Sequence, residues 1–248
     1  MPKKKIEDKE KNEDIIEIKD VEKRTKEEIE KEEKIAKWVP KTEIGREVKA
    51  GKIKEIDEIF RHGRRIIESE IFDVLLPNLE FDLIKIGQSK GKFGGGKRRA
   101  WRQTQKKTSE GNRPSFAAMV VVGDRKGHVG VGMEKAKETL PAREKAKRKA
   151  KLNIIKIKLG CGSFDCGCGT NHSIPFKVEG KCSSARIILI PAPKGTGLVV
   201  DDEVKKILKL AGIKDIYSKT FGQTRTKYNL ITACINALKK INEFVEKE

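Results

Sequence analysis

Apolar residues follow two different periods along the chain, and the first of them is helical. Residues 1–36 are dense in Glu and Lys with scattered isoleucines, which is typical of a solvated helix or a disordered arm. Beyond them, apolar positions recur at helical spacing over 53–60 and again over 66–75, until Pro77 ends the pattern. We therefore expect a charged arm, followed over 37–80 by a helical extension that docks on the rest of the fold.

After residue 80 the pattern changes to strands and then to one basic helix. A short strand is predicted over 81–86, and a hairpin over 116–132 with its turn at 124–127. A helix is predicted over 134–152, and it carries eight Lys or Arg against three Glu. The small residues that would let this helix pack closely on the sheet are Ala142, Ala146 and Ala150. Together these elements predict one unit over 81–154.

The rest of the chain predicts a second unit, an α/β domain over 155–248. Its predicted elements are strands over 154–159, 174–178, 185–190 and 215–220, a helix over 204–211 ended by Gly212, and a closing helix whose apolar face runs over 230–241. The whole chain is therefore expected to have an α+β fold.

The charge of the chain is concentrated in its folded part. The 248 residues have a net charge of +19 and are 36% hydrophobic, so a folded core is expected. Residues 1–36 carry 11 basic and 13 acidic side chains, which leaves 45 and 24, a net of +21, for the remainder. This balance is too basic for an ordinary metabolic enzyme and suits a polyanionic partner. The sequence shows no membrane span or apolar signal segment, so we expect a cytoplasmic protein with no membrane partner.

A basic, glycine-rich stretch over 87–113 holds nine Lys or Arg, six glycines and one acid. Guanidinium and ammonium groups bind phosphate, and aromatic side chains can stack on bases, so the stretch predicts binding to nucleic acid. Its first candidate contacts are Lys90, Lys92, Lys97, Arg98, Arg99, Trp101 and Arg102. A solvated charge run is the alternative for the stretch, and Trp101 could equally fill a small satellite core.

The glycines at 91 and 96 followed by Lys97 imitate a phosphate-binding loop of nucleotide hydrolases. Arg98 occupies the position where such a loop needs a Ser or Thr to bind magnesium, so we predict no catalytic residues and no enzyme.

Three of the five cysteines lie within eight residues of one another and close to a histidine. The candidate metal ligands are Cys161, Cys166, Cys168 and His172, enough for one tetrahedral zinc ion. The spacing is not that of a standard zinc finger, so two interpretations stay open: a zinc site, or reduced cysteines that act as small buried residues. Cys182 is a substitute ligand, and Cys234 lies on the apolar face of the last helix.

Several short motifs resemble one family. They are WVPKT at 38–42 with Gly45-Arg46 after it, VVVG at 120–123, GHVGVG at 127–132, GCGSFDC at 160–166, HSIPF at 172–176, IPAPKGTGLV at 190–199, LAGI at 210–213 and TRT at 224–226. In this order they are similar to the small-subunit ribosomal proteins of the S-five family in its archaeal form, whose eukaryotic counterpart is called S-two.

The resemblance implies a domain similar to double-stranded-RNA-binding domains and a C-terminal α/β domain with a left-handed βαβ crossover. It also implies that a hairpin loop contacts small-subunit ribosomal RNA near the decoding region and the path of messenger RNA, and supports translational accuracy. The matching loop residues are Gln105, Lys106, Lys107, Thr108, Gly111 and Arg113. The charge of the basic helix over 134–152 favours phosphate contacts from Lys145, Arg148 and Lys149 as well, with a merely solvated helix face as the alternative. Residues 87–104 are an addition to the strand and loop that the family usually has here, so the path of the chain through this segment stays open.

The implied partners are ribosomal RNA and neighbouring small-subunit proteins, and the implied location is the ribosome. Composition alone would equally permit a free regulatory protein that binds double-stranded RNA. Sedimentation of cell extract separates the two hypotheses, because only the first predicts migration with small subunits.

Overall fold

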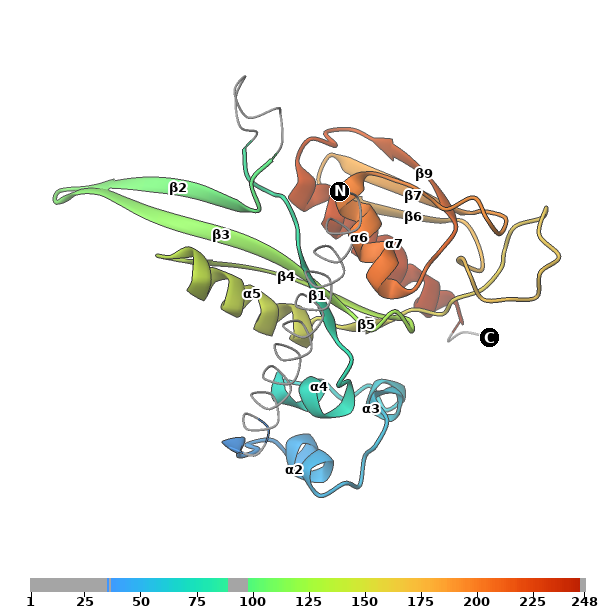
Figure 1. Cartoon of the computed structure of the whole chain (residues 1–248), viewed down its shortest axis with the longest axis horizontal. Helices are drawn as coiled ribbons and strands as arrows, with labels where there is room; N and C mark the ends of the chain where they lie inside the picture. Colours follow the sequence, from blue (N-terminus) through green and yellow to red (C-terminus); the bar gives the residue numbers. More distant parts are fainter. Residues whose placement is uncertain (1–34, 36, 89–97, 246–248) are drawn as a thin grey trace, which may run out of the picture.

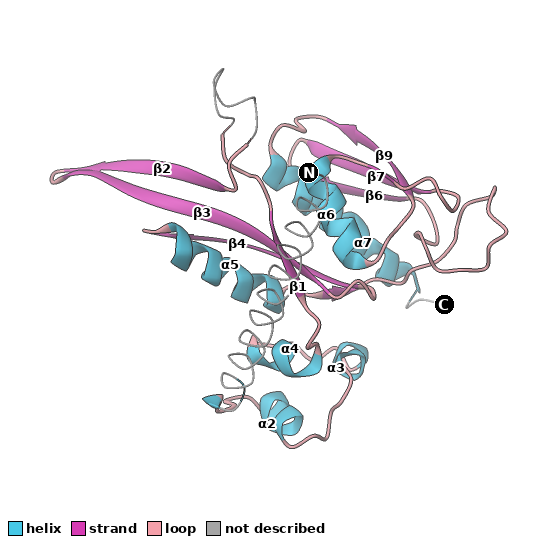
Figure 2. Ribbon diagram, in the orientation of Figure 1, coloured by secondary structure: helices cyan, strands magenta, loops and turns pink. Residues whose placement is uncertain are grey.

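The computed structural model describes Ile35 and residues 37–88 and 98–245. Two β-sheets and six helices make up the described part of the chain (Figure 2). The first sheet contains β1 (Glu80–Leu83), β2 (Trp101–Thr108), β3 (Gly111–Gly123), β4 (His128–Ala136) and β5 (Ile155–Lys156). The second contains β6 (Val178–Cys182), β7 (Ala185–Pro191), β8 (Leu198–Val199) and β9 (Ile216–Phe221). The helices are α2 (Glu43–Lys49), α3 (Ile56–Arg61), α4 (Glu70–Leu75), α5 (Thr139–Leu152), α6 (Asp202–Ala211) and α7 (Lys227–Val245).

Strands β1 and β2 pair with the same edge of β3, one after the other. Leu83 in β1 lies opposite Val120, and Trp101 in β2 lies opposite Ala118. The described residues on either side of 89–97 therefore reach this edge of β3 at neighbouring positions. Of residues 87–104, whose path the resemblance leaves open, 101–104 are regular strand.

The β2–β3 hairpin extends well beyond the helix that covers the sheet (Figure 1). Every residue of β2 is exposed, and so are the first four residues of β3. The remainder of β3 is half-buried or buried. The hairpin is therefore an exposed two-stranded ribbon that continues out of a buried strand. The loop expected over 105–113 is largely strand, with its turn at Ser109 and Glu110.

Helix α5 covers one face of the first sheet, and its predicted alanine face is confirmed. Ala142, Ala146 and Ala150 are fully buried. Gly132 in β4 makes the contact close enough: a Cβ there would lie 2.3 Å from the amide nitrogen of Ala150 and 2.4 Å from the carbonyl oxygen of Ala146. The prediction that the helix begins at residue 134 was wrong, because 134–136 complete β4 and α5 begins at Thr139.

The helical extension docks on this same side of the sheet. It consists of three short helices, and its buried side chains join the alanine face of α5 in one apolar cluster. The main contributors from the extension are Val48, Ile56, Ile59, Ile66, Ile71 and Phe72. Polar contacts add to the docking: Trp38 donates its indole N–H to Glu68 at 2.9 Å, and Lys151 pairs with Asp73 at 2.6 Å.

The other face of the first sheet packs against α6, which belongs to the second unit. Figure 1 shows α6 and α7 between the two sheets. Met119 and Val121 from β3 share one buried cluster with α6, α7 and the inner face of the second sheet. The predicted stop of α6 is confirmed, since Gly212 adopts the left-handed conformation with φ of +89°. None of the helices in the described ranges is long and apolar enough to cross a membrane.

The second sheet has the order β6-β7-β9-β8, and only its last pair is parallel. Strand β8, helix α6 and strand β9 therefore form a βαβ unit with adjacent strands. This is the unit for which the family implies a left-handed crossover, and its hand stays a prediction.

Two predicted strands lie elsewhere than expected. Residues 155–156 form β5, which pairs with β4 at His128 and Val129, so this strand joins the first sheet and not the second unit. The strand expected over 174–178 begins only at Val178. Residues 172–176 instead lie against the cysteine-rich loop, which is described below.

Candidate nucleic-acid interface and metal centre

The exposed hairpin carries cations that face one another. Lys106 lies directly opposite Arg113 across the ribbon, so both side chains project from the same face. Like charges placed directly opposite are destabilising unless an anion lies between them. Within the described part of the chain, no acidic side chain forms an ion pair with Lys106, Lys107 or Arg113. The hairpin therefore has the charge and the exposure that a phosphate backbone requires.

The turn of the hairpin depends on Gly111. Its φ is +117°, a region that side chains rarely adopt, and no atom of the chain lies within 4 Å of where a Cβ would be. Thr108 supports the turn by donating its hydroxyl hydrogen to the carbonyl of Gly111 at 2.7 Å. Gly111 is therefore required for the turn geometry, not for close packing within the chain.

The residues around the start of β2 carry further predicted contacts. Gly87 donates its amide to the carbonyl of Arg99 at 2.9 Å, two residues before β2 begins. Arg99 and Arg102 are exposed, and Arg98 is half-buried. Trp101 is 42% exposed, so it does not fill a satellite core, and its ring is open to a stacking partner. The predicted contacts Lys90, Lys92 and Lys97 lie outside the described residues.

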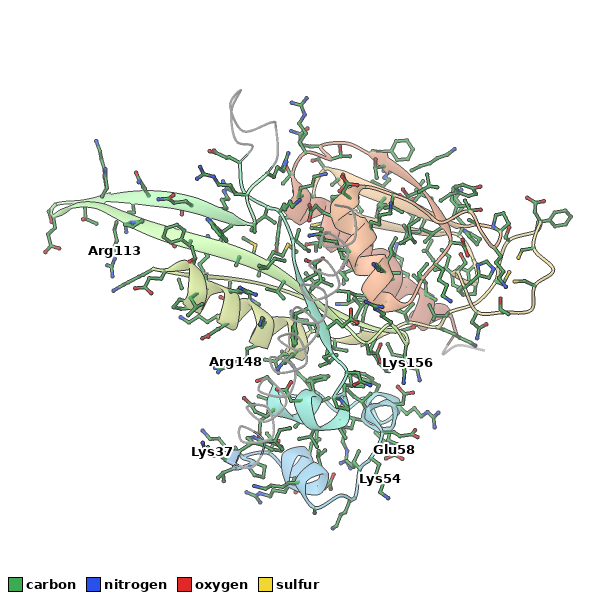
Figure 3. All side chains as sticks on the ribbon, in the orientation of Figure 1. Lys37, Lys54, Glu58, Arg113, Arg148 and Lys156 are labelled. Atoms are coloured by element: carbon green, nitrogen blue, oxygen red, sulfur yellow. The ribbon has the colours of Figure 1, made fainter. Side chains whose placement is uncertain are left out.

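Helix α5 presents part of the predicted basic surface. Lys145 and Arg148 are exposed, and Figure 3 shows Arg148 on α5 and Arg113 on the hairpin. Lys149 is also exposed, but it pairs with Glu134 at 2.6 Å. Its charge is therefore partly balanced within the chain, unlike the charges of the hairpin.

The buried histidine His128 links the extension to the sheet. His128 lies at the start of β4, with Nδ1 2.6 Å from Oδ2 of Asp124 and Nε2 3.1 Å from Oδ1 of Asp57 in α3. Lys156 in β5 also pairs with Asp57. Burial disfavours the charged ring, but the two carboxylates outweigh it and raise the pKa of His128 above its ordinary value of 6.5. Asp57 and His128 are far apart along the chain, so the sequence carries no local signal for this contact.

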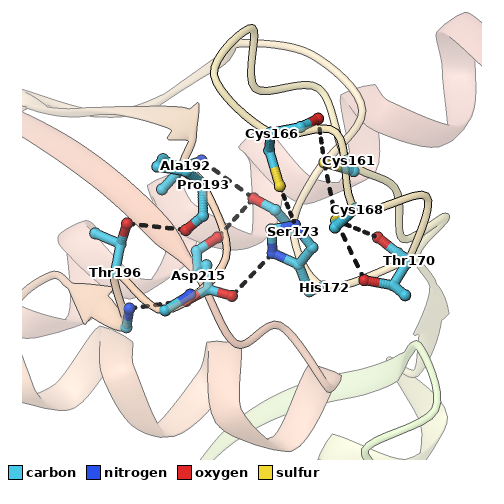
Figure 4. A network of polar contacts seen from close by, with 12 residues as sticks. Cys161, Cys166, Cys168, Thr170, His172, Ser173, Ala192, Pro193, Thr196 and Asp215 are labelled. Atoms are coloured by element: carbon cyan, nitrogen blue, oxygen red, sulfur yellow. Dashed lines mark hydrogen bonds and ion pairs between the residues drawn. The ribbon is translucent and has the colours of Figure 1, made fainter.

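The four predicted metal ligands come together at one point (Figure 4). The Sγ atoms of Cys161, Cys166 and Cys168 and a ring nitrogen of His172 all lie within 4.8 Å of one another. The Cys161 and Cys168 sulfurs are 3.7 Å apart, and the Cys166 sulfur is 3.5 Å from Nε2 of His172. Tetrahedral zinc with ordinary bond lengths requires separations of about 3.8 Å between two sulfurs and about 3.6 Å between sulfur and nitrogen. The residues present therefore fit a zinc ion.

The three thiols differ in pKa. Hydrogen bonds from the side chain and backbone of Thr170 lower the pKa of Cys168 to about 6, and the backbone amide of Lys194 lowers that of Cys166. Desolvation, together with hydrogen bonds to the other two thiols, raises the pKa of Cys161 to about 11. Thiolates are the metal-binding form of cysteine, and three of them at this distance need a cation between them. The three cysteines are half-buried, so they are not packed as small core residues.

The other two cysteines lie apart from this cluster. Cys234 is fully buried on α7, as predicted, and its pKa is raised to about 12 by burial alone. Cys182 is half-buried against the apolar core, and it is not among the grouped ligand atoms. It is therefore not needed as a substitute ligand.

His172 is held from its far side by a second buried residue. Its Nδ1 lies 2.8 Å from Oδ2 of Asp215, and both side chains are almost completely buried. The two atoms are close enough for an ion pair but are not aligned as a hydrogen bond, so Nδ1 has no hydrogen-bond partner. Asp215 was not predicted as part of the site, because nothing in its sequence neighbourhood connects it with His172.

Comparison with known proteins decides the family. The model of the N-terminal domain of ribosomal protein S5 matches residues 100–158, and that of its C-terminal domain matches residues 180–248. The chain belongs to the ribosomal protein S5 family. A relative named small ribosomal subunit protein uS5 from Nanoarchaeum equitans is 53% identical over 84% of this chain and 89% of its own length. Proteins of the same name from Methanocaldococcus jannaschii and Thermofilum pendens are 50% and 47% identical, over 84% of this chain and 89% and 95% of their own lengths.

Only one of the two candidate sites lies inside a stretch that the S5 family models match. The first matched stretch includes the whole β2–β3 hairpin and α5, and it begins just before Trp101. The cysteine-rich loop lies between the two matched stretches. The two S5 domains agree with the predicted α+β fold, whereas the contacts of individual side chains with RNA stay predictions.

Proposed function

We propose that this protein is a constituent of the small ribosomal subunit and binds its ribosomal RNA through the β2–β3 hairpin. The names of the uS5 relatives support the first part. The second part rests on one observation: Lys106 and Arg113 lie opposite each other on an exposed ribbon without an acidic partner in the described ranges. The proposed role is structural and not enzymatic, and the partners are ribosomal RNA and neighbouring small-subunit proteins.

Co-sedimentation tests this proposal and separates it from a free RNA-binding regulator. Tagged full-length protein expressed in archaeal cells should migrate with small subunits through a sucrose gradient in low salt. A variant with Lys106→Ala and Arg113→Ala should release from subunits at lower salt than the wild type does. Wild-type protein found only at the top of the gradient would support the free regulator instead.

We also propose that the hairpin lies near the decoding region and the path of messenger RNA, and that it supports translational accuracy. This finer placement rests on the family resemblance of residues 105–113 and on their exposure. Losing one charge-assisted contact from Lys107 can shift a balance between two subunit conformations by about tenfold, which corresponds to about 1.4 kcal/mol. Subunits that assemble normally with Lys107→Ala should misread near-cognate codons at a changed rate. An unchanged error rate would leave the hairpin as an assembly contact only.

For the cysteine-rich loop we propose one structural zinc ion held by Cys161, Cys166, Cys168 and His172. The support is the match between the ligand separations in the structure and those of tetrahedral zinc. When bound, the ion would cross-link the loop over 161–172, and no chemistry beyond this is needed from it. Elemental analysis of purified full-length protein should find about one zinc per chain. Zinc absent from the wild type, or retained at full stoichiometry by a Cys161→Ser, Cys168→Ser double variant, would reject this site.

A further inference from the structure

The buried carboxylate of Asp215 contacts two different parts of the structure with its two oxygens. Oδ2 lies against Nδ1 of His172, and Oδ1 accepts hydrogen bonds from the backbone amides of Gly195 and Gly197, at 3.1 Å and 2.8 Å. Its side chain is only 6% exposed. Within the described ranges, no lysine or arginine forms an ion pair with it. Its charge is therefore balanced by the histidine and by the loop at 193–197 alone.

Backbone contacts fix Asp215 against His172 as well. The amides of Lys214 and Asp215 both donate to the carbonyl of His172, at 2.9 Å and 3.2 Å. The buried hydroxyl of Ser173 donates to the carbonyl of Asp215 at 2.5 Å (Figure 4). The backbone of Asp215 is therefore held beside that of His172, with the carboxylate next to the ring.

The loop at 193–197 faces the cysteine-rich loop with its donors. The amides of Gly195 and Gly197 donate to the carboxylate of Asp215. These two N–H groups are therefore not available to bind a phosphate from outside. The glycine-rich sequence of this loop, which suggests an anion-binding turn, is instead used to surround the His172 side of the cluster.

We propose that Asp215 is the outer-shell positioning residue of the metal centre and that it couples metal binding to the conformation of the 193–197 loop. This inference rests on the zinc site proposed above. A histidine that binds metal through Nε2 carries its proton on Nδ1, and the carboxylate of Asp215, 2.8 Å from that nitrogen, stabilises this tautomer by its charge even without an aligned hydrogen bond. Here the same carboxylate also holds two loop amides, so metal at Nε2 orders the loop through Asp215.

Two variants separate this coupling from an ordinary loop contact. Asp215→Asn keeps the size of the side chain but removes its negative charge and one of its two acceptor oxygens. The asparagine therefore cannot face His172 and accept from the loop amides in the way that the aspartate does. Loss of a positioning partner of this kind typically costs about 10-fold to 100-fold in metal affinity. Thr196→Val is the matched control, because it removes the bond from the Thr196 hydroxyl to the carbonyl of Pro193, at 2.8 Å, without touching Asp215.

The experiment measures two quantities on full-length protein: zinc affinity by competition with a chromophoric chelator, and hydrogen exchange of the Gly195 and Gly197 amides with and without zinc. In the wild type, zinc removal should speed exchange of both amides. Asp215→Asn should lower zinc affinity about 10-fold to 100-fold and make their exchange fast and independent of zinc. Thr196→Val should lower zinc affinity far less than Asp215→Asn does, because it leaves the contacts of Asp215 in place.

The two ways in which the proposal can fail are distinguishable. A wild type that binds no zinc overturns the metal site and the coupling together. A wild type that binds zinc, but whose two loop amides exchange equally fast with and without it, overturns the coupling alone. This second readout uses only the wild type, so it holds even if Asp215→Asn does not fold, and circular dichroism of each variant shows whether it does.

Discussion

The hairpin makes a quantitative prediction about the salt dependence of RNA binding. Replacing Lys106, Lys107 and Arg113 by alanine removes three exposed cations from an exposed part of the ribbon. The fold should therefore be unaffected, because all three positions lie on the exposed ribbon, close to its turn at residues 109–110. The variant should differ from the wild type in RNA binding alone.

The size of the effect depends on how many of the three cations bind phosphate in the wild type. Each cation that releases a counterion on binding contributes about 0.7 to 0.9 to the slope of log affinity against log salt concentration. If all three bind phosphate, the slope should flatten by about 2 to 3 units. Binding of full-length protein to a fragment of small-subunit ribosomal RNA, measured by fluorescence anisotropy at several salt concentrations, gives this slope directly.

A charge-matched control makes the result specific. Lys177, Lys181 and Lys219 are also charged, but they lie in the second unit, in or beside its sheet. Their replacement by alanine removes the same net charge and should change the slope by less than about one unit. Equal flattening by both triple variants would show that binding follows overall charge, and an unchanged slope in the hairpin variant would remove the hairpin from the interface.

Two further predictions concern stability. Gly132→Ala should destabilise the protein by about 1–3 kcal/mol in urea unfolding, because the new Cβ would lie 2.3 Å from the backbone of Ala150; a change below about 0.5 kcal/mol would contradict that close contact. The raised pKa of His128 contributes stability that is fully present below its ordinary value of 6.5 and is lost as the pH rises through the raised value. The difference in unfolding free energy between the wild type and His128→Gln should therefore be larger at about pH 6 than at about pH 9, and a difference independent of pH would show that the ring is not charged in the folded state.

Elements with a clear local sequence pattern were predictable from the sequence. The turn at 124–127, the alanine face of α5 and the glycine that ends α6 all carry local signals, and the structure has each of them. The grouping of the four candidate ligands was also predictable, because all four lie within the short segment from Cys161 to His172.

Other features depend on contacts that no local pattern encodes. Strand β2 is exposed on both faces, so it has no apolar alternation, and its pairing with β3 alone defines it. Strand β5 is only two residues long and is fixed by its pairing with β4. The contacts of Asp57 with His128 and of Asp215 with His172 join residues far apart in the chain. Such polar contacts arise from the packing of whole elements, which sequence periodicity does not describe.

Site-specific photo-cross-linking shows whether the hairpin contacts ribosomal RNA in the small subunit. A photoreactive amino acid at Ser109, in the turn of the hairpin, should cross-link to small-subunit ribosomal RNA in purified, intact subunits. The same group at Lys219, on β9 of the second unit, controls for incorporation into subunits. Cross-links from position 109 to ribosomal RNA are the predicted result. Cross-links from this position only to protein, in subunits that contain the full complement of the variant, would show that the turn of the hairpin does not contact ribosomal RNA.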